Sequence, residues 1–195
     1  MFHHIYQTEA IVLGSRVSGE SNRLFFLFTK ELGFIVAMAQ GIRELKSKLR
    51  FSLQDFGSTR VCMVRGKELW RITNAEPVNG YHSIFSNPKN VIFLTRIFLL
   101  LRRLLHGEER NEELFRAVSE MMHFLEDEEL SGKELLALEI AMNLKILHHL
   151  GYGTDREMYR VFIMMPPSKS VLNEIDAVKS QALADINAAL KESHL

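Results

Sequence analysis

The sequence has little cysteine and no long apolar run, and both absences narrow the class of protein. Its 195 residues include one cysteine, Cys62, which excludes an internal disulfide and a multi-cysteine metal cage and indicates a reducing compartment. The most apolar stretch, residues 91–106, is interrupted by Arg96, Arg102 and Arg103 and is shorter than the roughly 20 residues that span a bilayer. The N-terminal residues carry no secretory signal pattern. We therefore expect a cytoplasmic protein with no membrane partner.

The sequence also lacks the motifs of the common hydrolases. It contains no Gly-rich loop followed by Lys-Ser/Thr, no His-Glu-x-x-His pair and no Gly-x-Ser-x-Gly elbow. His148 and His149 are adjacent, so on a helix their side chains diverge by about 100° and cannot ligate one ion. We therefore expect none of these catalytic sites, no cofactor and no bound metal.

Charge is balanced over the whole chain but divided unequally between its halves. The chain has 24 basic and 24 acidic residues. Up to Val78 there are 11 basic and 7 acidic residues, a net charge of +4, and the remainder carries −4. Halves of opposite sign indicate two modules with different partners. A basic half suits a polyanion, because each neutralised phosphate releases counterions.

Short apolar or alternating segments, separated by glycine-containing turns, fill the first half. They cover residues 8–17, 23–29 and 34–41, followed by two strands within 58–78. About five short strands in so few residues are typical of a small barrel, and the five-stranded OB-fold is the first candidate. An SH3-like barrel fits this pattern nearly as well.

The apolar period becomes helical in the second half. The sequence predicts helices over residues 87–107, 111–127, 131–151 and 170–191. Ser131 and Glu134 have the spacing of a capping box at the start of the third. We therefore expect an α+β protein in two parts: an N-terminal OB-fold domain over residues 1–80 and an all-α helical domain over residues 81–195, without zinc.

Positive charge is concentrated within the basic half. Four cations lie in residues 41–50 against one acid, Glu44: Arg43, Lys46, Lys48 and Arg50. Four more flank two predicted turns: Arg16, Arg23, Arg65 and Lys67. Five aromatic residues are interleaved among them: Phe25, Phe26, Phe34, Phe51 and Trp70. A cluster of charge alone is equally typical of a solvated loop and of a binding site. Cations that bind phosphates and aromatic faces that stack on bases are, together, the two components of a single-strand binding surface.

The order and spacing of several motifs resemble the RecO family of bacterial DNA repair proteins. In the first half the resemblance covers residues 9–56 and 66–76, with a Gly-Glu-Ser turn, a Phe-Thr-x-Glu-x-Gly turn, an Ala-x-Gly-x-Arg segment and a Lys-Ser-x-Leu basic loop. In the second half "LEIAMNLKILHHLGYG" is similar to the family's helix ending in Leu-Gly-Tyr, and the C-terminal "ALKESHL" also matches.

The resemblance implies an N-terminal OB-fold, a helical C-terminal domain and no enzymatic activity. It implies binding of single- and double-stranded DNA, annealing of complementary strands, and binding of the acidic C-terminal tail of the single-stranded DNA-binding protein SSB. With RecR, and in some bacteria RecF, such a protein loads RecA. Arg43, Lys46, Lys48 and Arg50 are then contacts to strand backbones that leave base edges free to pair. The expected DNA-binding set also includes Arg16, Arg23, Arg65 and Lys67.

The tail of SSB, an acidic peptide with an apolar end, requires a hydrophobic pocket rimmed by cations. Cations are few in the acidic half, so we expect this partner near four of them: Arg102, Arg103, Lys133 and Lys145.

One departure from the family affects the helical half. Many members carry a four-cysteine zinc site just after the Leu-Gly-Tyr helix, whereas residues 154–170 contain no cysteine. The chain is also shorter than typical members, so we expect a trimmed, metal-free helical domain. Two other functions stay open: a protein-interaction adaptor whose positive patch binds an acidic protein, and an RNA-binding OB protein.

Overall fold

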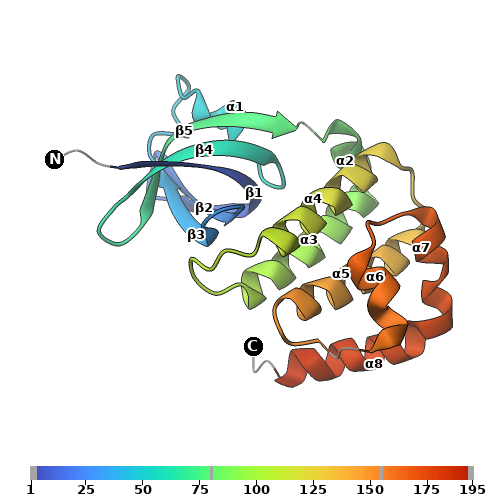
Figure 1. Ribbon diagram of the computed structural model, residues 1–195. Coiled ribbons are helices and arrows are strands. Elements are labelled where there is room, and N and C mark those ends of the chain that lie inside the picture. Colours follow the sequence, from blue (N-terminus) through green and yellow to red (C-terminus); the bar gives the residue numbers. More distant parts are fainter. Residues whose placement is uncertain (1–3, 80, 154–155, 193–195) are drawn as a thin grey trace. The chain divides into compact units, whose positions relative to one another are not determined.

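A computed structural model describes residues 4–79, 81–153 and 156–192 (Figure 1). The last three residues of the "ALKESHL" motif, 193–195, lie outside the described residues. By its internal contacts the chain divides into two compact units. The first contains residues 1–80 together with 105–112, and the second contains residues 81–104 and 113–195.

The first unit is a closed five-stranded barrel. Its strands are β1 (Ile5–Ser18), β2 (Asn22–Thr29), β3 (Gly33–Ala39), β4 (Ser58–Arg65) and β5 (Trp70–Asn79). They follow one another around the barrel in the order β1-β2-β3-β5-β4, and only the β3–β5 pairing is parallel. This arrangement is that of an OB-like barrel, which confirms the OB-fold prediction over the SH3-like alternative.

The barrel interior is built by alternate residues along each strand. On β2 the side chains of Phe25 and Leu27 point inward and are almost completely buried, as strand periodicity requires. Val61 and Met63 on β4 meet them from across the barrel core. Ile42, which follows β3, belongs to the same apolar cluster and covers part of one barrel end.

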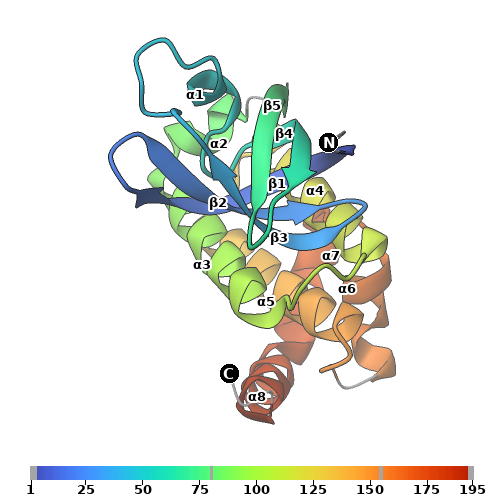
Figure 2. The same ribbon diagram turned by 90° about the vertical axis from the view of Figure 1, so that its left-hand side faces the viewer.

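The connection between β3 and β4 contains a short helix, α1 (Leu49–Ser52). The sequence predicted only a loop here. Leu53 directly follows α1 and is buried in the barrel core, so Ile42 and Leu53 anchor the two ends of the connection. Figure 2 shows the loop before α1 standing out from the barrel end, beside the β1–β2 turn.

The second unit is helical. Its elements are α2 (His82–Ser86), α3 (Pro88–Leu104), α4 (Glu112–Asp127), α5 (Gly132–His149), the 3-10 turn η1 (Glu157–Tyr159), α6 (Arg160–Met164), α7 (Lys169–Asn173) and α8 (Ile175–Glu192). The three long helices predicted first are confirmed. The fourth predicted helix is interrupted at Glu174 and forms α7 and α8, while α2, η1 and α6 were not predicted.

Helix α5 is the central element of this unit. It contacts α3, α6, α7 and α8, and ten of its side chains are buried, as expected for a helix that is surrounded by others. Its start has the predicted capping box: the Ser131 hydroxyl accepts from the Glu134 backbone N–H, and the Glu134 carboxylate accepts from the Ser131 N–H at 2.8 Å. No helix in the described part of the chain has the length and apolarity needed to span a membrane.

Candidate nucleic-acid interface

The basic stretch is fixed to the β1–β2 turn by backbone hydrogen bonds. The Gly41 N–H donates to the Asn22 side-chain oxygen at 2.9 Å, and the Arg43 N–H donates to the Ser21 carbonyl at 3.0 Å. Gly41 has φ of +63°, a conformation that glycine adopts without strain. The guanidinium of Arg43 also donates to the Glu20 carbonyl at 2.8 Å. These bonds hold Arg43 beside the start of β2.

Three arginines converge on one hollow at this end of the barrel. The hollow has a volume of about 280 Å³ and is lined by Arg23, Ile42, Arg43, Arg50 and Leu53; we call it the arginine hollow. Arg23 comes from β2, Arg43 from the loop and Arg50 from α1. Since Ile42 and Leu53 belong to the barrel core, they form the apolar lining beneath the guanidinium groups.

Arg23 occupies a position that strand alternation normally gives to a core side chain. It lies two residues before the buried Phe25 on the same face of β2, and its guanidinium lies 6.0 Å from the centre of the Phe25 ring. The Nε–H of Arg23 is buried and has no hydrogen-bond partner among the described residues. Its nearest acid is Asp55, 3.7 Å from NH2, which also accepts 2.6 Å from the Ser15 hydroxyl. The terminal N–H groups of Arg23 form no hydrogen bond with a described residue and remain available at the arginine hollow.

The loop outside the arginine hollow is exposed and carries two further cations. Lys46 and Lys48 are exposed and form no ion pair within the part of the chain that the structure describes. Two apolar side chains next to them are also exposed, Leu45 at 92% and Phe51 at 78%. An exposed aromatic ring beside four cations matches the composition of a single-strand binding surface.

The structure shows which of the five aromatic residues are buried and which are exposed, a distinction that the sequence does not give. Phe25 and Trp70 are buried in the barrel core and cannot stack on a base without unfolding it. Phe26 and Phe34 are half-buried and stack on each other, with ring centres 6.5 Å apart. Phe51 alone among the five is fully exposed to solvent.

The remaining predicted cations of the barrel lie away from the arginine hollow. Arg16 pairs in register with Leu24, on the face opposite to Arg23, and its guanidinium lies 6.0 Å from the Phe26 ring. Arg65 is opposite Trp70 at the β4–β5 turn, and β5 separates it from β3. Lys67 is exposed on that same turn. Five of the eight predicted cations thus lie at the arginine hollow or on the loop outside it. The other three lie at two separate places, Arg16 on β1 and Arg65 with Lys67 at the β4–β5 turn.

Arg65 has an acidic partner that sequence reasoning missed. Its guanidinium lies 3.2 Å from the Glu108 carboxylate, and the same carboxylate accepts 2.8 Å from the Trp70 indole N–H. Glu108 belongs to the segment 105–112, which packs on the barrel: the Phe34 N–H donates to the Gly107 carbonyl at 3.2 Å. No local pattern in the sequence distinguishes Glu108 from its acidic neighbours.

The four cations predicted for the partner lie in different surroundings. Lys145 is 4% exposed and donates 2.7 Å to the Met165 carbonyl, and burial lowers the pKa of its ammonium. Lys133 forms a 2.6 Å ion pair with Asp176. Arg102 is half-buried and Arg103 exposed in the last turn of α3. Lys145 therefore has no accessible charge to offer a partner.

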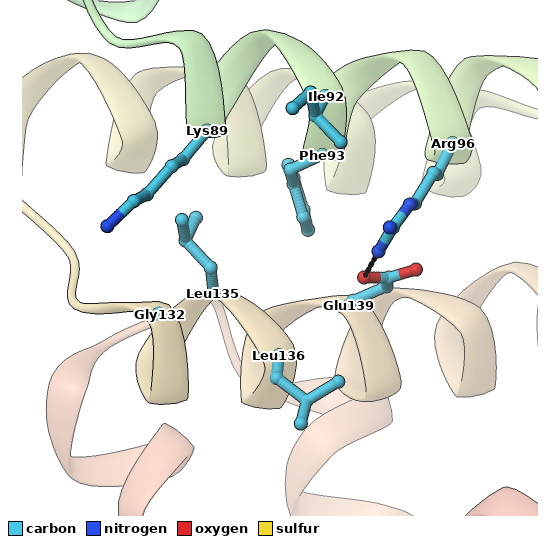
Figure 3. Close-up of a pocket in the computed structure, with 8 residues that line it drawn as sticks. All are labelled: Lys89, Ile92, Phe93, Arg96, Gly132, Leu135, Leu136 and Glu139. Carbon is cyan, nitrogen blue, oxygen red and sulfur yellow. Dashed lines mark hydrogen bonds and ion pairs between the residues drawn. The ribbon is translucent and has the colours of Figure 1, made fainter.

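A hollow between α3 and α5 has the apolar and charged lining that this prediction required. Figure 3 shows its lining: Lys89, Ile92, Phe93, Arg96, Gly132, Leu135, Leu136 and Glu139. We call it the helical groove; its volume is about 200 Å³. Arg96 at one end is held by Glu139 at 3.1 Å, whereas Lys89 extends from the other end without an ion pair to any described residue. The sequence prediction did not include Lys89, which lies just before the apolar stretch of residues 91–106.

A polar network occupies the place where the resemblance puts zinc in many relatives. Tyr159 is fully buried and donates a 2.6 Å hydrogen bond to Asp185 on α8. Arg156 lies 2.9 Å from the same carboxylate, and Gln181 donates to it at 3.0 Å. Among residues 4–79, 81–153 and 156–192 there is no group of three or more histidine, cysteine, aspartate and glutamate side chains that could hold a metal ion.

Comparisons with known proteins agree with both halves. Residues 1–81 match the family model "Recombination protein O N terminal", and residues 86–157 match "Recombination protein O C terminal". Helices α6, α7 and α8 lie beyond both matches.

Similar curated proteins carry the name "DNA repair protein RecO". The chain is 30% identical to that of Clostridium novyi over 156 residues, which are 80% of this chain and 60% of the relative. It is 26% identical to that of Alkaliphilus metalliredigens over 147 residues, 75% of this chain and 58% of the relative. It is 29% identical to that of Pelotomaculum thermopropionicum over 148 residues, 76% of this chain and 56% of the relative. The chain thus spans less than two thirds of the length of these relatives.

Proposed function

Because the chain belongs to the RecO family of DNA repair proteins, we propose that its barrel binds DNA strands by their phosphates. The observation that supports this most directly is the convergence of Arg23, Arg43 and Arg50 on one hollow. Guanidinium groups bind phosphate oxygens through paired hydrogen bonds, and phosphate contacts carry no sequence information. Lys46 and Lys48 extend the same positive surface along the loop.

Backbone contacts of this kind suit strand annealing. A strand held by its phosphates keeps its base edges free to pair with a complementary strand. Phe51 adds a stacking face that accepts any base. We propose that the protein binds single- and double-stranded DNA, anneals complementary strands and, with RecR and in some bacteria RecF, helps load RecA on SSB-coated DNA. The parts played by RecR, RecF and RecA rest on family membership alone.

The salt dependence of DNA binding tests the proposal. Binding of a labelled single-stranded oligonucleotide is measured by fluorescence anisotropy across a salt series. Replacing Arg43, Lys46, Lys48 and Arg50 together by alanine should reduce the magnitude of the log-affinity against log-salt slope by about 3, because each lost contact contributes about 0.7. Strand annealing should slow in the same variant.

A matched control removes cations elsewhere on the barrel. Lys30 and Arg60 already pair with Glu112 at 3.8 Å and Glu9 at 3.3 Å, so their replacement by alanine should change the slope much less per charge removed. Equal slopes in the wild type and the quadruple variant, with both folded, contradict the proposed surface. A clear preference for RNA over DNA of the same sequence favours the RNA-binding alternative, and binding of neither favours the adaptor.

We further propose that the helical groove receives the acidic tail of SSB. Ile92 and Leu136 are exposed hydrophobic side chains at the groove, and they provide an apolar surface for the end of the tail. Lys89 offers an unpaired ammonium for a carboxylate of the tail. Arg96 can contribute if an incoming carboxylate competes with Glu139. This groove replaces the position near Lys145, whose ammonium is buried.

Titration with a synthetic tail peptide tests the groove. Lys89→Glu should weaken peptide binding at least about tenfold, because it reverses the charge that meets the peptide carboxylates. Leu136→Asp should weaken it by placing a charge on the apolar surface. Lys191→Glu, an exposed substitution of the same kind on α8, is the control and should leave the affinity unchanged. If Lys89→Glu and Leu136→Asp both bind the peptide as tightly as the wild type, the tail binds elsewhere.

A further inference from the structure

The charge of the arginine hollow exceeds that of one phosphodiester. Three guanidinium groups line it, and one carboxylate, Asp55, lies 3.7 Å from Arg23. The local net charge is therefore about +2. An internal phosphodiester carries one negative charge, whereas a phosphate monoester at a strand end carries about −1.5 to −2 at pH 7. The hollow matches the monoester in charge.

The donors of the arginine hollow also exceed what a phosphodiester accepts. A monoester presents three terminal oxygens, and a diester only two. The terminal nitrogens of Arg23 form no hydrogen bond with a described residue, and a guanidinium offers five N–H donors in all. Arg50 forms no ion pair with any described residue. These groups can surround a phosphate that has only one ester bond.

The size of the arginine hollow limits what it can hold. Ile42 and Leu53, which line it, are buried in the barrel core, so the hollow has a closed floor on the side of the core. The volume of about 280 Å³ is close to the lower limit of small-ligand sites, roughly 300 Å³, and suits a phosphate with part of its sugar.

We propose that the arginine hollow binds the terminal phosphate of a DNA strand, with Arg23, Arg43 and Arg50 as its ligands. This inference rests on the proposed function and makes it more specific, because it assigns recognition of strand ends to the same surface. Lys46, Lys48 and Phe51 then hold the nucleotides that follow the end. A protein that binds a strand end holds that strand at one point while its base edges stay free to pair.

The test compares three oligonucleotides of one sequence, about 12 nucleotides long, to match the site size of an OB barrel. One has no terminal phosphate, one has a 5′-phosphate and one has a 3′-phosphate, and each is labelled at an internal base. Anisotropy at fixed salt should show about tenfold tighter binding of one phosphorylated form, as expected when charged hydrogen bonds are added. The phosphorylated oligonucleotide that binds more tightly shows whether the 5′ end or the 3′ end is bound.

Two variants test whether the tighter binding of the phosphorylated oligonucleotide comes from the arginine hollow. Arg50→Gln, on the exposed helix α1, should reduce the phosphate advantage to threefold or less, and Arg23→Gln should do the same. Lys46→Gln removes one charge outside the hollow and should weaken the binding of all three oligonucleotides equally. The ratio of the affinities for the phosphorylated and unphosphorylated forms should therefore not change. An advantage that persists in Arg50→Gln, or that falls equally in Lys46→Gln, overturns the inference.

The outcomes separate this inference from the proposed function. If all three oligonucleotides bind equally tightly, and with strong salt dependence, DNA binding stands and terminal-phosphate recognition is wrong. If none of them binds, both are wrong.

Discussion

The indole N–H of Trp70 donates a 2.8 Å hydrogen bond to the carboxylate of Glu108, a residue 38 positions later in the chain. The second oxygen of that carboxylate lies 3.2 Å from the Arg65 guanidinium, which in turn lies 5.5 Å from the centre of the Trp70 indole. One carboxylate thus satisfies a nearly buried donor and neutralises a predicted DNA-binding cation. Arg65 therefore already has an acidic partner for its charge.

This pairing gives the first prediction. The double variant Arg65→Ala with Glu108→Gln removes the ion pair but keeps a hydrogen-bond acceptor for Trp70. We expect its affinity for single-stranded DNA and its salt slope to equal those of the wild type, because the net charge of the pair is already zero. Arg50→Ala, measured in parallel, should lower the slope by about 0.7. A loss in the double variant as large as in Arg50→Ala contradicts the prediction.

Much of the barrel could be predicted from local sequence. Alternating apolar residues and glycine turns located all five strands, since both signals act over a few residues. The strand order could not be read in this way. It depends on the short parallel pairing of β3 and β5, where Ala37 lies opposite Trp70, and such a contact between distant residues leaves no periodic signal.

The candidate site was predicted in composition but not in arrangement. The sequence identified Arg23, Arg43 and Arg50 as cations near turns, and only the fold brings them to one hollow. It also identified Lys145 as a cation, but the position of a lysine on a helix does not show which neighbouring segment covers it. Burial of Lys145 depends on α6, which the sequence did not predict.

Gly33 should tolerate no side chain, and this gives a second prediction. Its φ is +71°, and a Cβ built on it would overlap the backbone of Glu109. Gly33→Ala should therefore lower the free energy of unfolding by about 2–3 kcal/mol in urea denaturation. Gly19→Ala is the matched control, because Gly19 has φ of +70° but open space around it, so only the backbone cost of about 1 kcal/mol is expected. Equal losses in the two variants would show that residues 105–112 do not pack against Gly33.

Phe51 allows stacking to be tested apart from charge. Phe51→Ala should weaken single-strand binding about tenfold, since stacking of a base on an aromatic ring contributes about 1–3 kcal/mol. The salt slope should not change, because no phosphate contact is lost. Leu45→Ala is the control: Leu45 is exposed but offers no aromatic face. Anisotropy across a salt series measures both quantities, and a changed slope in Phe51→Ala contradicts this assignment.

Lys145 should affect stability and not the binding of the SSB tail. Burial lowers the pKa of its ammonium in the folded protein, so the charged form is penalised at pH values below that pKa. The penalty is relieved as pH rises towards the unfolded value of 10.5. The stability of the wild type relative to Lys145→Met should therefore increase between pH 7 and pH 10 in urea denaturation. Tail-peptide affinity should be the same in both proteins, and a weaker affinity in Lys145→Met contradicts its burial.

Tyr159 and Asp185 should make stability sensitive to pH at both extremes. Burial, together with the hydrogen bond to Asp185, raises the pKa of Tyr159 to about 12, and the same hydrogen bond lowers the pKa of Asp185. A raised tyrosine pKa stabilises the fold below the unfolded value of 10 and loses that contribution as pH rises from about 10 to 12. A lowered aspartate pKa stabilises the fold above 3.8 and loses its contribution as pH falls through the lowered value.

Tyr159→Phe should therefore cost about 1 kcal/mol of unfolding free energy near pH 7, where the hydrogen bond to the Asp185 carboxylate is lost. The difference between wild type and variant should diminish above pH 10, because Tyr159 ionises in the unfolded chain while the fold keeps it protonated, and below pH 3.8, because Asp185 takes up a proton in the unfolded chain before it does so in the fold. Tyr152→Phe is the control, because Tyr152 is exposed and should give no difference at any pH. Urea denaturation of the three proteins from pH 3 to pH 11 measures this, and a Tyr159→Phe difference that is constant across the range would show that the Tyr159–Asp185 bond does not couple stability to pH.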